Sequence, residues 1–190
     1  MEKLTMERAK ELLAATTTEQ HLFEHAIGVS AAMGAMADHF GADRAYWEAV
    51  GYLHDYDYEQ WPEEHLQHTR EPLLAAGVNE EAVNAILAHG WGHCTDVQPV
   101  TKLEKSLFTV DELTGLVAAT ARMVPTGLIG LETRSVKKKF KNKKFAAKID
   151  RELIQRGCDL LGMELDAVIE LCIQGMTAHA EELGLAAKEA

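Results

Sequence analysis

Apolar residues recur every three or four positions along most of this chain, which is the spacing of amphipathic helices. The clearest stripe lies within residues 19–40 and consists of Leu22, Ala26, Val29, Met33, Met36 and Phe40. A second stripe lies within residues 103–123 and consists of Leu103, Leu107, Val110, Thr114, Val117 and Ala121. The chain shows no strand-like alternation of apolar and polar residues. These patterns predict an all-α fold.

Capping residues and breakers divide the pattern into separate helices. Helices are expected at about residues 5–16, 19–40, 43–55, 68–76, 79–89, 103–123, 150–162 and 163–183. Asp43 and Asn79 stand at N-cap positions, and Gly41 follows the end of the second helix. Pro62 predicts an irregular connector over residues 59–68, because proline restricts the backbone around it.

Length and composition place the chain among ordinary globular proteins. It has 190 residues, of which 47% are hydrophobic and 26% charged, and we expect a single domain over residues 1–190. The net charge of -11 argues against general binding to nucleic acid or to anionic membranes. Three scattered cysteines, a charged N-terminus and the lack of a long apolar run favour a cytoplasmic protein without a membrane span.

A histidine directly followed by an aspartate closes the apolar run of the third expected helix. These residues are His54 and Asp55, in the sequence Gly-Tyr-Leu-His-Asp. Imidazole and carboxylate together are ligands for Zn, Mn, Fe, Co or Ni. Neighbouring residues on a helix point about 100° apart, so both reach one ion only near a helix terminus. The doublet therefore predicts a transition-metal site at the end of this helix.

Other metal-competent side chains lie on apolar or glycine-flanked segments. They are His25, His68, His89, His93 and Asp111. Asp111 abuts the apolar stripe of its helix, and burying it without a partner would be costly unless a cation is shared with the doublet. His25 lies one turn from His21, with Gly28 below it leaving room for a ligand. Ordinary structural roles are expected for His21, His39, His65 and His179.

With these residues in this order, the chain resembles the HD superfamily of metal-dependent phosphohydrolases. The family signature is matched by His25 in Glu-His-Ala-Ile-Gly-Val, by His54-Asp55, and by Asp111 in Phe-Thr-Val-Asp-Glu-Leu. The resemblance implies a helical bundle of the HD type with its core at about residues 19–123. Additional C-terminal helices and a basic segment would follow at about residues 134–185. The resemblance also implies that His25, His54, Asp55 and Asp111 hold a divalent metal ion.

The number of ions, one or two, is left open by the sequence. Family members with two metals add histidines, and His68 and His89 look like those two, with Asp55 bridging the ions. Many such members carry a further histidine directly after the position of His89, where this chain has Gly90. His93, in the following loop, is a candidate replacement.

The resemblance implies hydrolysis of a small phosphorylated compound, with a nucleotide as the first expectation, by attack of metal-activated water. Asp55 would act through the metal, and Asp57 is a candidate for orienting the water or protonating the leaving group. A solvated loop carboxylate is the alternative for Asp57. Two other functions stay open: a di-iron oxygenase, as in a few relatives of the family, and a non-catalytic regulator that binds metal or nucleotide.

A basic segment interrupts this acidic chain. Residues 134–148 contain eight basic side chains and no acidic one. Candidates for holding substrate phosphate are Arg134, Lys137, Lys138 and Lys139. A solvated face is the alternative, and nucleic-acid binding is the weaker option because the patch is single and short. A homodimer is compatible with the sequence.

Overall fold

A computed structural model of the chain describes residues 3–187, and this range contains nine α-helices and no strand. The helices are α1 (Met6–Ala14), α2 (Gln20–Phe40), α3 (Arg44–Leu53), α4 (Arg70–Ala75), α5 (Glu80–Ala88), α6 (Lys102–Ala121), α7 (Thr133–Lys141), α8 (Arg151–Leu161) and α9 (Leu165–Thr177). A short 3-10 helix, η1 (Pro62–Glu64), lies in the connector after α3. The expected all-α fold is confirmed.

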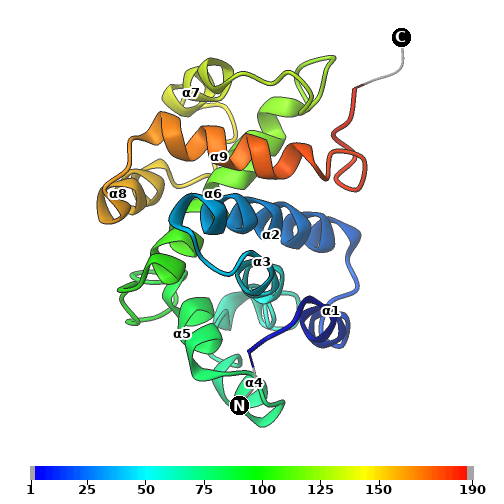
Figure 1. Ribbon diagram of the computed structural model, residues 1–190, viewed down its shortest axis with the longest axis vertical. Coiled ribbons are helices and arrows are strands. Elements are labelled where there is room, and N and C mark those ends of the chain that lie inside the picture. Colours follow the sequence, from blue (N-terminus) through cyan, green and yellow to red (C-terminus); the bar gives the residue numbers. More distant parts are fainter. Residues whose placement is uncertain (1–2, 188–190) are drawn as a thin grey trace.

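Helix α2 lies across the middle of the molecule, with α1 and α3 on one side and α9 on the other (Figure 1). Residues 28–37 of α2 are all buried, so this part of the helix is enclosed on every side. The sequence pattern predicted a single core-facing stripe, and the structure extends it around the helix. Most of the additional buried positions are glycine, alanine or serine, which allow neighbouring helices to approach from several directions.

Two of those neighbours approach α2 at glycine residues. A Cβ atom on Gly175 of α9 would lie 2.2 Å from the Ala31 carbonyl oxygen. A Cβ atom on Gly51 of α3 would lie 2.9 Å from Met33 Cγ. Both helices therefore pack at a distance that only glycine permits. The approach of α3 brings its C-terminal end, and the His54-Asp55 doublet, against the side of α2.

Among the described helices, α1, α3, α6 and α8 begin with a side-chain cap. The Thr5 and Asp43 side chains accept hydrogen bonds from backbone N–H groups in the first turns of α1 and α3. Thr101 and Glu104 form a capping box at the start of α6. This cap was not predicted from the sequence. Asn79 stands before α5 but makes no cap bond; its side chain accepts from Leu4 N–H and donates to the Tyr46 hydroxyl.

The C-terminal part differs from expectation in two places. The last helix, expected over residues 163–183, ends at Thr177 and is followed by turns. The basic segment, for which no helix was expected, forms α7 up to Lys141, and the loop after it is held by the Arg151 guanidinium. That group donates to several loop carbonyls, including those of Ala146 and Ile149. This loop ends at Ile149 and Asp150, which line a pocket between the helices.

Helices α7, α8 and α9 pack against α6, and α9 also packs against α2, so together they form the upper part of the molecule in Figure 1. Between residues 3 and 187, no helix combines the length and apolarity needed to span a bilayer.

Candidate metal centre

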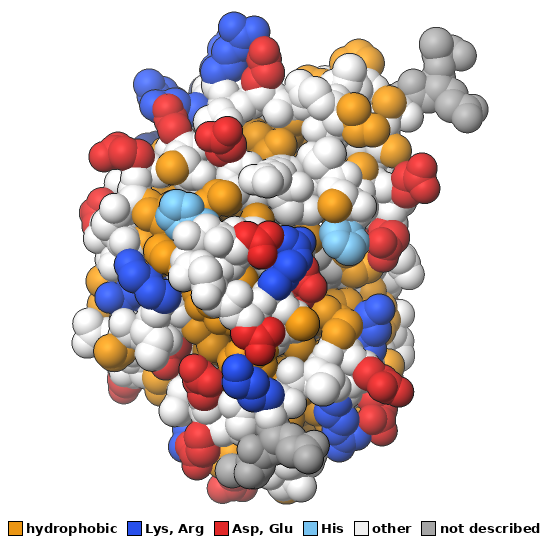
Figure 2. Space-filling model, viewed as in Figure 1, with side chains coloured by type: hydrophobic (Ala, Val, Ile, Leu, Met, Phe, Trp, Pro, Cys, Tyr) orange, Lys and Arg blue, Asp and Glu red, His pale blue; other side chains and the backbone are white. Residues whose placement is uncertain are grey.

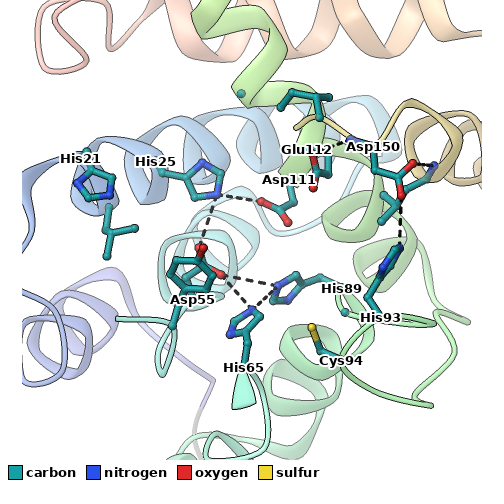
Figure 3. A pocket seen from close by; sticks show the side chains of 16 residues that line it. His21, His25, Asp55, His65, His89, His93, Cys94, Asp111, Glu112 and Asp150 are labelled. Atoms are coloured by element: carbon teal, nitrogen blue, oxygen red, sulfur yellow. Dashed lines mark hydrogen bonds and ion pairs between the residues drawn. The ribbon is translucent and has the colours of Figure 1, made fainter. Parts of the chain in front are cut away.

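Histidine and aspartate side chains from four helices and one connector meet between α2, α3, α5 and α6 (Figure 3). His25 comes from the first half of α2 and Asp111 from the middle of α6. The His25 Nε2 atom lies 2.9 Å from Asp111 Oδ1 and 3.7 Å from Asp55 Oδ2. These three residues, expected to be ligands of one ion, are therefore close neighbours in the structure.

His54 is the most deeply placed member of the cluster, with no exposed surface. Its Nδ1 atom lies 2.7 Å from the Gly51 carbonyl oxygen, a bond in which the ring N–H donates. Its Nε2 atom is 3.3 Å from both Asp55 Oδ2 and Asp111 Oδ1, yet makes no hydrogen bond with suitable geometry. Buried polar atoms are rarely left without a partner. A metal ion between the two carboxylates would supply one.

The second oxygen of Asp55 faces two further histidines. Asp55 Oδ1 lies 3.3 Å from His65 Nε2 and 3.7 Å from His89 Nε2, and these two nitrogens are 3.2 Å apart. The Nδ1 atom of His89 is held by the Ile86 carbonyl at 2.5 Å. The two oxygens of Asp55 therefore face two different pairs of histidines, which is the arrangement expected of a bridging carboxylate.

The donor atoms fall into three overlapping groups in which all ligand atoms lie within 4.8 Å of one another. The groups are His25, His54 and Asp55; His54, His89 and Asp111; and Asp55, His65 and His89. Imidazole nitrogen and carboxylate oxygen suit Mn, Fe, Co, Ni or Zn. The cluster thus fits a divalent transition metal in both donor type and spacing.

The carboxylates and histidines of the cluster shift one another's pKa values. Burial alone would raise the pKa of Asp55 and of Asp111, but the neighbouring histidines lower both well below the usual range. Burial would likewise lower the pKa of His65, but hydrogen bonds to Asp55 and Asp57 raise it to about 9. Burial lowers the pKa of His89 to about 4, so this ring is neutral and available as a ligand. The carboxylates require a compensating positive charge, which a metal would provide.

Asp57 lies behind this cluster and does not line the pocket. Its carboxylate is fully buried and accepts hydrogen bonds from His65 Nδ1 at 2.8 Å, Leu66 N at 3.0 Å and His68 N at 3.1 Å. Burial would raise the pKa of Asp57, but these bonds lower it. Asp57 was expected to lie beside a substrate as a catalytic residue, but the structure places it away from the pocket. Asp57 instead orients His65.

His68 is outside the cluster, contrary to expectation. Its Nε2 atom bonds Glu64 at 2.6 Å and its ring stacks on Trp61, with ring centroids 4.5 Å apart. The histidine of this connector that reaches the cluster is His65, for which an ordinary structural role was expected. Neither the spacing nor the polarity of the connector distinguishes the two residues. The turn that separates them, with Leu66 at a φ of 69°, carries no sequence signal.

His93 lies at the mouth of the pocket and not among the cluster residues. It is exposed, and its Nε2 atom is 3.4 Å from Asp150 Oδ2. A Cβ atom on Gly90 would lie 2.4 Å from Leu66 Cδ1, so a side chain at this position would require Leu66 to shift. The residue next to His65 thus packs against the position that directly follows His89.

A cavity of about 500 Å³ opens over the cluster. Its wall includes His21, Tyr58, Glu112, Ile149, Asp150 and Leu153 in addition to cluster residues. None of the described residues that line it is a lysine or an arginine. An anion in this cavity would therefore depend on metal ions or protonated histidines for its countercharge.

The basic segment, expected to hold substrate phosphate, lies elsewhere. Lys and Arg side chains gather over α7, at one end of the molecule (Figure 2). Arg134 pairs with Glu132, Lys137 Nζ lies 2.8 Å from Asp166, and Lys139 sits 4.4 Å above the Phe145 ring. Neither these residues nor Lys138 line the cavity over the cluster. Contrary to expectation, all four lie outside the wall of this cavity.

A partly buried set of histidines and aspartates on neighbouring helices, open to a pocket on one side, defines a helical domain suited to binding divalent metal. Comparison with known families matches the HD domain over residues 22–115. The chain belongs to the HD superfamily of metal-dependent phosphohydrolases, and the resemblance noted from the sequence is confirmed. Comparisons with curated proteins and with solved structures gave no significant match.

Proposed function

We propose that this protein is a metal-dependent hydrolase of a small phosphate ester. The observation that carries the proposal is His54 Nε2, a buried nitrogen without a hydrogen bond, placed 3.3 Å from each of two carboxylates beneath an open cavity. Membership of the HD superfamily supports the same chemistry. A nucleotide stays the first substrate class to be tested.

The residues take distinct roles in this proposal. His25, His54, Asp55 and Asp111 would hold the essential ion, and Asp55, His65 and His89 would hold a second ion. When bound, such ions lower the pKa of coordinated water and stabilise charge on a phosphoryl oxygen. Asp57 keeps His65 in the tautomer and orientation that present Nε2 to the centre.

The cavity supports a small substrate and a metal requirement. Its volume of about 500 Å³ lies in the range of ligand pockets for small molecules. Glu112 and Asp150 add negative charge to the wall. Because the described lining residues include no lysine or arginine, a phosphate group is attracted mainly by the ions themselves.

The test is a metal-to-chain ratio by elemental analysis, paired with a screen for phosphate release across divalent ions. We expect one or two transition metals per chain, phosphate release, and loss of both in Asp55→Ala with helical content retained. Asp166→Ala, an exposed carboxylate outside the site, is the matched control and should behave as wild type.

The other outcomes are equally informative. Two irons per chain without phosphate release would favour the oxygenase alternative. Absence of metal even after reconstitution, or normal turnover by Asp55→Ala, would contradict the proposal.

A further inference from the structure

A second, narrower cavity of about 230 Å³ adjoins the one over the metal centre. His21, His25 and Gly115 line both cavities, so the two lie side by side. We infer that this side groove binds the organic part of the substrate, and that this part is slender and apolar. The inference rests on the proposed function, which places the phosphoryl group at the metal centre.

The groove runs between facing stripes of α2 and α6. On α2, His21, His25 and Gly28 follow one another at spacings of four and three residues, and therefore share one side of the helix. On α6, the corresponding stripe is Asp111, Gly115, Ala118 and Arg122, at spacings of four, three and four. On α6 the cluster residue Asp111 stands at one end of this stripe, whereas on α2 the cluster residue His25 lies between the groove residues His21 and Gly28.

Small residues keep the groove open and narrow. Gly28, Gly115 and Ala118 place little or no side chain between the two helices. A Cβ atom on Gly28 would meet Met176 Cε at 3.5 Å and Leu183 Cδ2 at 3.9 Å, which is ordinary van der Waals contact. The gap therefore accommodates an unbranched chain or a flat ring more readily than a bulky group.

The floor of the groove comes from the C-terminal part of the chain. Met176 lies on α9, and Leu183 and Leu185 lie in the segment after it; all three are buried. These residues fall outside the range matched by the HD family, which ends at residue 115. The C-terminal part thus adds an apolar wall to a metal centre built from family positions.

The lining chemistry favours apolar over polar ligand groups. The Thr114 hydroxyl already bonds the Asp111 carbonyl at 2.8 Å within α6. The charged lining residues are at the more open positions, with Glu24 half-buried and Arg122 exposed. Apolar ligand atoms gain free energy by leaving water for such a wall, whereas polar base edges would find few buried partners.

The groove is tested with phosphonates, which offer the same anionic group without being hydrolysed. Binding of methylphosphonate and n-pentylphosphonate to the metal-loaded protein is measured by calorimetry. We expect the pentyl compound to bind at least about tenfold more tightly, because its methylenes are buried in the groove. Ala118→Leu fills the groove and should remove most of this preference while leaving methylphosphonate binding unchanged. Ala119→Leu, the same change at the next, half-buried position outside the groove, should keep the preference.

Three results would overturn the inference. They are equal affinity for the two phosphonates, failure of both to bind, and tighter binding of a nucleoside phosphonate that is selectively lost in Ala118→Leu. Turnover of phosphate esters, measured separately, decides the proposed function. Hydrolysis without a preference for longer chains would support the proposed function and contradict the proposed role of the groove. Preferential pentylphosphonate binding without phosphate release would support the groove as a binding site and contradict the proposed hydrolysis.

Discussion

The histidines of the cluster are oriented by what their Nδ1 atoms contact. His54 and His89 each occupy the C-cap of a helix and bond the carbonyl three residues earlier. The last carbonyls of a helix lack intrahelical partners, so this contact satisfies them and turns Nε2 toward the cluster. His65 lies in an irregular connector, where the Asp57 carboxylate, in place of a helix carbonyl, contacts its Nδ1 atom and orients the ring.

Alanine substitution of each of the two connector histidines, His65 and His68, tests their placement. His65→Ala should weaken metal binding by at least about tenfold, since even residues that only orient metal ligands contribute that much. His68→Ala should leave affinity unchanged, because its ring contacts Glu64 and Trp61 on the surface. Competition with a chelator, followed by metal analysis, measures both. Equal losses in the two variants would contradict the structure at this point.

The site residues that sequence could predict are those in ordered helical patterns. His25, the His54-Asp55 doublet and Asp111 were found from helix periodicity and from the family resemblance. His65 was missed and His68 was named in its place, because a connector without periodicity does not reveal which side chain turns inward. The inward turn depends on Asp57, whose oxygens bind the backbone around Leu66, and such a contact is visible only in three dimensions.

At the level of whole elements, the start of α2 is fixed from a distant part of the chain. Glu19 is the N-cap residue but makes no side-chain cap bond. The Glu59 carboxylate instead accepts from Thr18 N at 2.8 Å, Thr18 Oγ1 at 2.7 Å and Glu19 N at 3.0 Å. The loop after the His54-Asp55 doublet is thereby tied to the helix that carries His25. Sequence predicted the helix and its end, but this cap comes from 40 residues away.

This contact predicts a pH-dependent contribution to stability. Hydrogen bonds from the Glu19 and Thr18 backbone lower the pKa of Glu59 below its unfolded value of about 4.3. The stabilisation is therefore fully present above that pH and is lost as pH falls through the folded-state pKa. Glu59→Gln should lower the free energy of unfolding at pH 7, with a difference that shrinks below about pH 4. Urea unfolding measures it; Glu63→Gln, an exposed carboxylate on η1, is the control. A difference independent of pH would contradict this account.

For the whole molecule, the C-terminal helices complete the site without contributing to the metal cluster. The loop before α8 and the start of α8 place Ile149, Asp150 and Leu153 on the wall of the main cavity, and α9 closes the side groove. The all-α fold was predictable from periodicity. The position of the basic segment was not, because the face that α7 presents depends on packing against α9. Val136 is buried there and Lys137 reaches Asp166.

Metal should also stabilise the molecule as a whole. The cluster joins α2, the ends of α3 and α5, the connector and α6, so its donor atoms converge only when these elements are folded together. A metal that binds the folded chain at 100 times its Kd adds about 2.7 kcal/mol, which corresponds to roughly 5–10 °C in Tm for a chain of this size. Stripping with a chelator should lower Tm by that amount, and adding metal back should restore it.

Asp111→Ala separates this effect from nonspecific binding. The variant removes the only carboxylate of the His54, His89 and Asp111 group, which is also the carboxylate 2.9 Å from His25 Nε2. It should therefore melt at one temperature with or without metal while keeping its helical circular dichroism. A metal-dependent rise in Tm that persists in Asp111→Ala would mean that the stabilising ion binds without Asp111, either at Asp55, His65 and His89 or elsewhere on this acidic chain. A wild type that melts identically after stripping would show that the cluster folds without a cation, its carboxylates balanced by protonated His54 and His65 alone.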